Sequence, residues 1–248
     1  MPIPRLHLFE FEDQKWFPSF LRDMMTDYLR FAGNKLGVLN PSLDLITETL
    51  KETSKTKVFD MCSGGSGAWI SLFPKIKEVV PDFSLSLSDL YPNIRAFDIV
   101  EKEGKGEIKT IREPVDALNV NRSTDSLRTQ CLSFHHFDEN MAVKLIQNAV
   151  DNNDPILILE GQERSLATVI QFMFVPIFVL LLTPFIMPFS VSRYVFTYLI
   201  PVLPLLILWD GVVSVLRTYT PEEMGVLIKK VNGHENIAGM LENLVARV

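Results

Sequence analysis

A short apolar strand runs directly into a turn of glycine and serine, and this junction constrains the fold more than any other segment. The expected strand covers residues 57–61, the turn is residues 62–67 (Cys-Ser-Gly-Gly-Ser-Gly), and apolar residues recur at helical spacing over residues 68–80. Glycine lets the backbone approach a ligand closely, and the free N–H groups at the start of a helix face that ligand. Strand, glycine-rich turn and helix in this order are typical of a nucleotide-binding unit, although a purely structural turn has the same composition.

The alternation of strand and helix continues along the chain. Further strands are expected at residues 83–87, 107–111, 127–134 and 155–159, and further helices at residues 93–103 and 138–150. Amphipathic helices near residues 16–29 and 40–50 precede this region, and residues 242–248 are expected to form a final edge strand. This spacing predicts an α/β fold with a Rossmann-like, doubly wound and mostly parallel sheet.

An acidic residue, Asp89, directly follows the second expected strand and lies twenty-odd residues beyond the glycines. In a Rossmann-like crevice this position lies beside the adenosine ribose, where a carboxylate accepts hydrogen bonds from both hydroxyls. A solvated acid at the end of a strand is the alternative. The glycine turn and Asp89 occur at the spacing that a nucleotide site needs. Together they are better evidence for such a site than either feature alone.

At these residues the chain resembles the class I S-adenosylmethionine-dependent methyltransferases, in a form that carries a hydrophobic insert. The first motif of that family is an acid followed by alternating glycines, which Asp60 and Gly64 match, whereas Cys62 and Ser66 stand where glycine is usual. The segments Ser-Phe-His-His-Phe at residues 133–137 and Arg-Thr-Tyr-Thr-Pro-Glu-Glu at residues 217–223 also resemble family segments. The resemblance covers roughly residues 57–231 without the insert.

The resemblance implies S-adenosylmethionine as the cofactor, with the glycines at its methionine end, Asp89 at the ribose and Asp116 at the adenine amine. It implies these cofactor-binding residues: Asp60, Cys62, Ser63, Gly64, Gly65, Gly67, Asp89, Leu90, Asp116, Ala117 and Phe134. A nicotinamide-dependent Rossmann enzyme is an alternative. It is disfavoured because Gly65 and Gly67 are too close together for the three-glycine dinucleotide fingerprint.

Two adjacent histidines, His135 and His136, follow the fourth expected strand, where a side chain would point into the crevice. Methyl transfer depends mainly on positioning, and a base is needed only if the acceptor must lose a proton. His135, His136 and Glu160 are therefore the candidate catalytic residues, and Glu163 is a further polar group near the mouth. A structural histidine bonded to backbone at the strand end is the alternative reading.

The apolar excess of the chain, with a mean hydropathy of +0.18, is concentrated in residues 166–189 and 195–209. The first of these segments is long enough to span a hydrocarbon core of roughly 30 Å. A membrane hairpin, spanning or re-entrant, is expected, because parts of one sheet lie on both sides of the insert and must stay on one side of the bilayer. The alternative is a buried hairpin at the core of an oligomer.

These features predict four regions: an N-terminal helical lid (1–56), a Rossmann-like core (57–164), a hydrophobic hairpin (165–216) and the C-terminal part of the core (217–248). The expected acceptor is a lipophilic small molecule drawn from membrane lipid, and the alternative is a non-catalytic membrane protein used for binding or assembly. The net charge of −6 gives no support for a nucleic-acid partner. No signal peptide is expected. The two cysteines are expected to be free thiols, and no Cys/His set has zinc spacing, so no metal is predicted. The prediction is a membrane-associated enzyme whose catalytic domain lies on the cytoplasmic face.

Overall fold

Parallel strands form the central sheet in residues 3–121 and 124–233, the part of the chain that the computed structural model describes. Five strands lie there in the order β3-β2-β1-β4-β5, with these bounds: β1 Lys57–Met61, β2 Ser84–Leu87, β3 Ile108–Thr110, β4 Leu127–Cys131 and β5 Ile156–Leu159. Every pair of neighbours is parallel. The chain order reverses between β1 and β4, so the ligand crevice of this fold lies at the carboxyl ends of these two strands. The predicted Rossmann-like α/β fold is confirmed.

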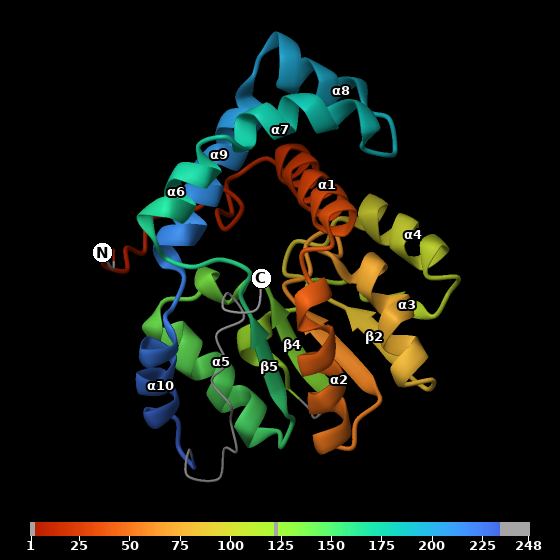
Figure 1. The fold of residues 1–248 in the computed structure, drawn as a ribbon, viewed down its shortest axis with the longest axis vertical. Helices are drawn as coiled ribbons and strands as arrows, with labels where there is room; N and C mark the ends of the chain where they lie inside the picture. The colour runs from red at the N-terminus through yellow and green to blue at the C-terminus, as the bar shows by residue number, and fades with distance from the viewer. Residues whose placement is uncertain (1–2, 122–123, 234–248) are drawn as a thin grey trace.

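Helices cover both faces of the sheet (Figure 1). One face carries α2 (Leu43–Glu52), α3 (Trp69–Val79) and α4 (Ile94–Glu103), whose apolar side chains share one core cluster with the strands. The other face carries α5 (Glu139–Asp151) and α10 (Pro221–Lys229), which enclose a second cluster. The sheet is therefore buried on both faces, as a doubly wound fold requires.

Two helices begin at side chains that cap them. Asp138 accepts a hydrogen bond from the Met141 N–H at 2.9 Å and begins α5. Thr220 and Glu223 form a reciprocal capping box at the start of α10, with Pro221 as its first residue. These side chains satisfy N–H groups that have no partner within the helix.

The fourth strand is shorter than the sequence predicts. It ends at Cys131, because Leu132 adopts a left-handed backbone with φ of 57° and residues Phe134–His136 form a 3₁₀ turn, η3. The prediction of strand through residue 134 is therefore wrong. The predicted edge strand at residues 242–248 lies outside the described residues.

The hydrophobic insert forms a helical hairpin above the carboxyl edge of the sheet (Figure 1). Its elements are α6 Leu166–Phe172, α7 Val175–Leu182, the 3₁₀ turn η4 Thr183–Phe185, α8 Val191–Tyr194, a π-helical segment Val195–Leu199 and α9 Val202–Arg217. Leu166–Phe185 is apolar and long enough to cross a membrane, with 20 residues, a mean hydropathy of 2.4 and 11% of its most apolar window buried. The segments Val191–Leu199 and Val202–Arg217 pass the same test only together and are bent by 80°.

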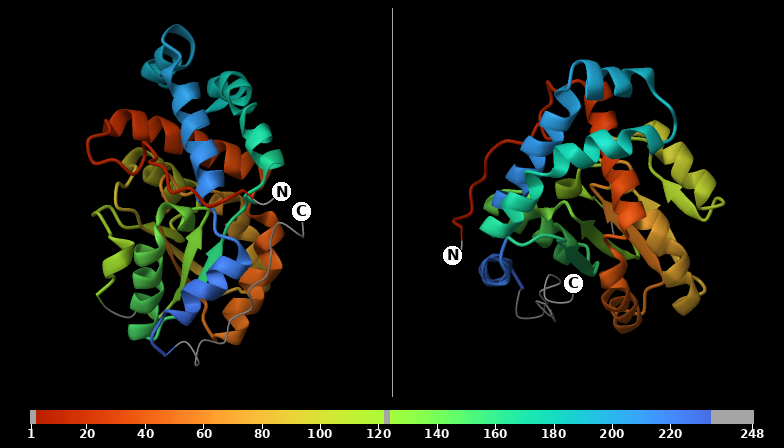
Figure 2. Two further views of the ribbon diagram at one scale, coloured as in Figure 1. Left: turned by 90° about the vertical axis from the view of Figure 1, so that its left-hand side faces the viewer. Right: turned by 45° about the horizontal axis from the view of Figure 1, so that its top comes forward.

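The first helix, α1 (Ser19–Leu36), lies between the hairpin and the sheet (Figure 2). Its apolar side chains share a third core cluster with α7 and α9. Near the hairpin tip the buried Arg193 donates to the carbonyl oxygens of Ile186 (2.9 Å) and Pro188 (3.1 Å) and pairs with Asp27 of α1. The hairpin is therefore packed against α1 through α7, its tip and α9.

Candidate cofactor and acceptor site

The glycine turn and the acid after β2 meet directly at the carboxyl edge of the sheet. The Gly64 N–H donates to Asp89 Oδ2 at 2.7 Å, and the Ser63 N–H donates to the Ser88 carbonyl oxygen at 2.9 Å. Gly64 and Gly67 adopt left-handed backbones, with φ of 54° and 51°, as a tight turn of this kind needs. The structure thus brings together the two features whose register the sequence predicts.

Asp89 is fixed by backbone donors on both oxygens, because its Oδ1 also accepts from the Tyr91 N–H at 2.7 Å. Burial raises the pKa of Asp89, although the bonds from Tyr91 and Gly64 oppose this. The next residue, Leu90, is exposed. A carboxylate held in this way keeps one orientation, and each of its oxygens has a second lone pair for a ligand hydroxyl.

The Asp60 side chain is buried beneath the turn and stabilises it through hydrogen bonds. It is 1% exposed and accepts hydrogen bonds from the Ser63 and Thr129 hydroxyls, both at 2.6 Å. Burial raises the pKa of Asp60 to about 6, although the two hydroxyls act to lower it. At 1% exposure the Asp60 carboxylate has almost no surface for direct contact with a cofactor.

Two other predicted cofactor residues have mainly structural environments. A Cβ placed on Gly65 would lie 3.0 Å from the Thr26 carbonyl oxygen of α1, so Gly65 is needed for the close approach of that helix. Burial raises the pKa of the Cys62 thiol to about 12, which keeps it neutral. Gly67 differs, because a Cβ there would meet no atom within 4 Å and the space beside it is open.

The predicted adenine side lies beside Asp89. The Val115 N–H donates to the Asp89 carbonyl oxygen at 2.8 Å, and Asp116 caps a 3₁₀ turn, η2, by accepting from the Leu118 N–H at 2.9 Å. Ala117 is buried in the second core cluster. The loops that follow β2 and β3 are therefore joined, as a shared adenosine site requires.

Phe134 does not line the crevice with its side chain. It is 1% exposed, and its ring packs against Phe137 and Tyr219 at centroid distances of 6.2 and 5.5 Å. The predicted cofactor contact at Phe134 therefore does not involve its ring. Its ring belongs to the core, and only its backbone is available to a ligand.

His135 and Glu160 form a pair at the carboxyl ends of β4 and β5. Glu160 accepts from the His135 N–H at 2.9 Å and lies 3.0 Å from His135 Nδ1 through its other oxygen. The histidine is 4% exposed. Glu160 therefore fixes both the backbone and the ring of His135, whereas Glu163 is exposed and lies apart from this pair.

His136 faces acids that come from the N-terminal strap, which we define as residues 5–14. Its Nδ1 lies 2.8 Å from Asp13 Oδ1 and 2.9 Å from Glu10 Oε2. Burial alone lowers the pKa of His136, but Glu10 and Asp13 outweigh it and hold the pKa well above the ordinary value. His136 is therefore paired and positively charged at neutral pH, so the structure separates the two candidate histidines and leaves His135 as the candidate base.

The strap is attached along α9 and η3. Arg217 donates to the Leu8 carbonyl oxygen at 2.6 Å and to Asp13 Oδ2 at 2.6 Å, and Asp210 accepts from the N–H groups of Phe11 and Glu12 at 2.8 and 3.1 Å. Sequence reasoning missed Glu10 and Asp13, because more than 120 positions separate them from His136. The only signal available was the unusual number of acids in the first residues.

The α1 helix is a second contact that sequence reasoning missed. Asn34 donates to the Gly67 carbonyl oxygen at 2.7 Å and accepts from the Ser71 N–H at 2.8 Å. Asn93, which caps α4, donates to the Thr26 hydroxyl at 2.9 Å. The outer side of the glycine turn is therefore attached to α1 and α4.

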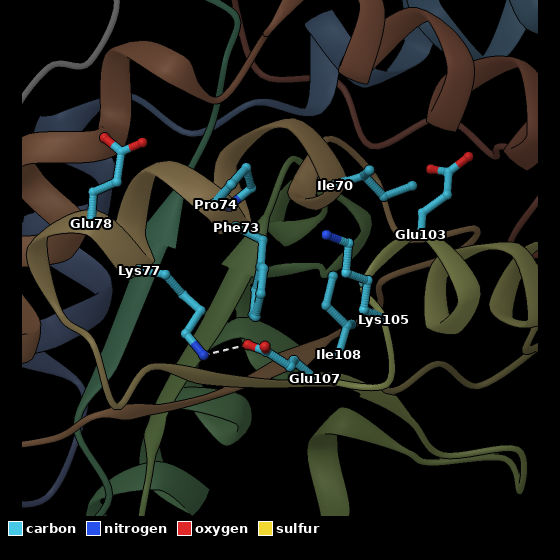
Figure 3. A pocket seen from close by; sticks show the side chains of 10 residues that line it. Ile70, Phe73, Pro74, Lys77, Glu78, Glu103, Lys105, Glu107 and Ile108 are labelled. Atoms are coloured by element: carbon cyan, nitrogen blue, oxygen red, sulfur yellow. Dashed lines mark hydrogen bonds and ion pairs between the residues drawn. The ribbon is translucent and has the colours of Figure 1, made fainter.

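A separate hollow of about 400 Å³ lies between α3 and the loop from α4 to β3. Figure 3 shows Phe73 and Ile108 within it and the ion pair of Lys77 with Glu107 at its rim. It is formed by the ends of α3 and α4 and the start of β3, at the edge of the sheet opposite the crevice. It contains none of the predicted site residues.

Comparison with known proteins gives matches among solved structures only. No protein-family model matches the chain, and no curated protein matches it. The structure is similar to an O-methyltransferase family protein from Burkholderia thailandensis, with 20% identity over 52% of this chain and 40% of that one and a TM-score of 0.39. It is similar to the mitomycin 7-O-methyltransferase MmcR, with 12% identity over 76% and 47% of the two chains and a TM-score of 0.41.

A third similar structure is the plantazolicin methyltransferase BpumL in complex with SAH, with 14% identity over 86% of this chain and 75% of that one and a TM-score of 0.48. The chain spans less than half of the length of the first two structures. In the regions that these alignments cover, the chain is similar to methyltransferases.

Proposed function

We propose that the protein transfers a methyl group from S-adenosylmethionine to a lipophilic acceptor drawn from a membrane. The observation that carries this proposal is the bond between the Gly64 N–H and Asp89 Oδ2, 2.7 Å long, at the carboxyl edge of the sheet. It places a glycine turn and a ribose-type acid side by side at the position where Rossmann-like folds bind nucleotides.

The residues present fit this cofactor. The open space beside Gly67 leaves room for its methionine end, the fixed carboxylate of Asp89 suits two ribose hydroxyls, and Asp116 lies next to Asp89 for the adenine amine. S-adenosylmethionine supplies an electrophilic methyl group. The chain supplies orientation, which carries most of the rate of an in-line displacement.

We propose that His135 contacts the acceptor and takes its proton. Because Glu160 holds Nδ1, the other ring nitrogen, Nε2, is left to accept the proton of an acceptor hydroxyl. The proton of the acceptor hydroxyl would pass to Nε2, and the oxygen would receive the methyl group that bound S-adenosylmethionine would supply, with S-adenosylhomocysteine as the leaving group. Glu160 is a positioning residue in this arrangement, since it fixes the ring and stabilises its charged form.

The acceptor class is inferred from the outer face of the hairpin. Large apolar side chains are exposed along it, each more than half exposed: Leu166, Ile170, Met173, Phe174, Ile177, Phe178, Leu181, Phe185, Phe189 and Val191. A contiguous apolar surface of this kind is typical of membrane or protein contact. Its first residues directly follow the Glu160 end of β5, so a lipid-soluble acceptor would meet the crevice beside the bilayer.

We infer that this hairpin lies in the interface rather than across the bilayer. Its tip is bound to α1 through Arg193 and Asp27, and α1 contacts the glycine turn through Thr26 and Asn34. Insertion of the whole hairpin would carry the charged residues of α1 into the hydrocarbon core, which is costly. An in-plane orientation buries the outer face of the hairpin and leaves α1 with the catalytic domain.

Calorimetry of the full-length protein with S-adenosylhomocysteine, and separately with NAD, tests the cofactor. We expect S-adenosylhomocysteine to bind and NAD not to bind. Incubation with labelled S-adenosylmethionine and a membrane lipid extract should then yield a product heavier by one methyl group. Binding without any labelled product would favour a non-catalytic role, and NAD binding alone would overturn the methyltransferase assignment.

A further inference from the structure

The contact between the N-terminal strap and η3 brings acidic side chains together with two histidines and an arginine. Glu10, Glu12 and Asp13 belong to the strap, and Asp210 of α9 accepts hydrogen bonds from the strap N–H groups of Phe11 and Glu12. Arg217 is the permanent cation that pairs with Glu10 and Asp13. Arg22 lies nearby, but it donates to the carbonyl oxygens of Glu12 and Gln14.

One carboxylate oxygen in this cluster has no partner. Glu12 Oε1 is buried and forms no hydrogen bond to any residue in the described ranges. A buried carboxylate without a donor is costly, and such groups in native structures usually accompany an ion or water that satisfies them. Glu12 lies in the strap between Glu10 and Asp13, the two acids that face His136.

The carboxylate oxygens of Glu10 and Asp13 face two different partners, Arg217 and His136. Glu10 Oε1 and Asp13 Oδ2 face Arg217, and Glu10 also accepts on Oε1 from the Ser214 hydroxyl at 3.1 Å. The other two oxygens, Glu10 Oε2 and Asp13 Oδ1, converge on His136 Nδ1 at 2.9 and 2.8 Å. This division matches metal sites, where outer partners orient a carboxylate through the oxygen that does not bind the ion.

The spacing of these atoms is close to that of a metal site. Ligand atoms about 2.1 Å from one tetrahedral ion lie roughly 3.4 Å apart, so an ion that replaces the His136 proton would widen the 2.8 and 2.9 Å contacts by about half an ångström. His135 adds a second imidazole, since its ring lies 4.5 Å from that of His136 and one ligand atom from each of Glu10, His135 and His136 falls within a common distance of 4.8 Å. Glu10 is 1% exposed, so its carboxylate is not a solvated surface acid.

We propose that Glu10, His135 and His136, with Asp13 beside His136, form a binding site for one divalent transition-metal ion that replaces the His136 proton and clamps the N-terminal strap onto η3. Imidazole together with carboxylate favours ions such as Zn²⁺ or Mn²⁺ over Mg²⁺ and Ca²⁺, which prefer oxygen ligands alone. The site departs from the sequence expectation of no metal, because its ligands come from segments that no local spacing connects. Because Glu160 holds His135 Nδ1, an ion would bind through Nε2, so metal binding and proton transfer exclude each other at His135.

The test uses the full-length protein in detergent, stripped with a chelator and dialysed against Zn²⁺, Mn²⁺ or Mg²⁺ in turn, with the bound metal measured by mass spectrometry. We expect about one Zn²⁺ or Mn²⁺ per chain and no retained Mg²⁺. Glu10→Gln and His136→Gln should each lower the affinity by at least tenfold. His7→Gln is the matched control, because His7 is exposed and lies outside the cluster.

Circular dichroism checks that each variant folds, and Asp13→Asn replaces any variant that does not, because the Asp13 side chain is 30% exposed and tolerates the change more readily. Co²⁺ substitution gives a second reading, since visible absorption bands that shift in His136→Gln report a nitrogen ligand directly. Wild-type protein that retains no Zn²⁺ or Mn²⁺, or His136→Gln that retains as much as wild type, would overturn the site. Binding of S-adenosylhomocysteine is measured separately without metal, so failure of one proposal is distinguishable from failure of the other.

Discussion

The guanidinium of Arg193, near the tip of the hydrophobic hairpin, pairs with the carboxylate of Asp27 in α1, and both side chains are more than nine-tenths buried. The two residues are 166 positions apart in the chain. Their pairing makes the apolar insert a structural part of the α/β domain, because α1 also packs against the glycine turn.

Loss of the Arg193–Asp27 pair should destabilise the protein strongly. Arg193→Ala leaves Asp27 with only its longer contacts to Arg30 (3.9 Å) and Asn93 (3.3 Å), which costs at most about 3–5 kcal/mol for a buried pair. Urea unfolding in mild detergent measures the loss. Arg112→Ala is the matched control, since Arg112 pairs with Asp98 and Glu101 on the surface and its removal should cost less than about 1 kcal/mol. Equal losses in the two variants would show that the hairpin tip is not bound to α1.

Asp89 should control cofactor affinity. Asp89→Ala removes an acceptor for both ribose hydroxyls, and hydrogen bonds to a charged group contribute about 1.5–3 kcal/mol each. We expect affinity for S-adenosylhomocysteine to fall by at least tenfold in calorimetry. Asp82→Ala, which changes an exposed acid just before β2, is the control. A folded Asp89→Ala protein with wild-type affinity would remove Asp89 from the site.

His135 and Glu160 should act as one unit in turnover. His135→Ala is expected to lower kcat by about a hundredfold if the ring takes a proton, with cofactor affinity nearly unchanged. Glu160→Gln should shift the pH profile of kcat and lower it less, because it acts through the ring. The double variant should be no slower than His135→Ala alone. If the reductions in kcat of the two single variants multiplied in the double variant, His135 and Glu160 would act independently.

The outer face of the hairpin should hold the protein on membranes. Phe174→Ser with Phe178→Ser removes two half-exposed rings, each worth about 1.5–3 kcal/mol of apolar burial, and should weaken flotation with lipid vesicles. Binding of the wild-type protein should resist high salt, because salt screens charge attraction and not apolar burial. The matched control is Lys105→Ser at the opposite edge of the sheet. A wild-type protein that stays monodisperse without detergent or lipid would overturn the membrane assignment.

Complete removal of the hairpin is a poor version of this test. Val179 and Leu203 of the hairpin are fully buried against α1 in the third core cluster. A Gly/Ser linker in place of residues 166–216 would expose that surface of α1. Surface substitutions on the outer face avoid this loss of packing.

Stability should decrease as pH rises through the range in which Asp60 ionises. Burial raises the pKa of Asp60 from 3.8 to about 6, so the folded state holds the proton more tightly than the unfolded state. The resulting stabilisation is complete below pH 3.8 and is lost as pH rises through about 6, with a size of roughly 3 kcal/mol at most. Asp60→Asn should flatten this dependence in urea titrations between pH 4 and 8. An unchanged slope would show that Asp60 does not ionise in that range.

The parts of the site that the sequence predicts are those that depend on local order. Strand, turn and helix around Gly64 follow from short segments, and Asp89 follows because the end of β2 must lie beside the end of β1 in a doubly wound sheet. Glu10 and Asn34 could not be predicted in the same way. Their partners, His136 and Gly67, lie far along the chain, and no periodic pattern connects a strap or a covering helix to a strand end.

Phe134 illustrates a different limit. The apolar run after β4 indicates correctly that this segment is buried, but a pattern of apolar residues does not distinguish a core ring from a crevice wall. The backbone decides this, because the left-handed Leu132 turns the chain before Phe134.

Gly65 lies under the Thr26 carbonyl oxygen with no room for a side chain, so α1 and the cofactor turn are in van der Waals contact at that point. The same helix holds the hairpin through Asp27. If the bilayer and the cofactor each favour a particular position of α1, their two binding equilibria are thermodynamically linked, and each must change the affinity of the other by the same factor. Calorimetry of S-adenosylhomocysteine with and without vesicles then measures one half of that cycle, and flotation with and without S-adenosylhomocysteine measures the other.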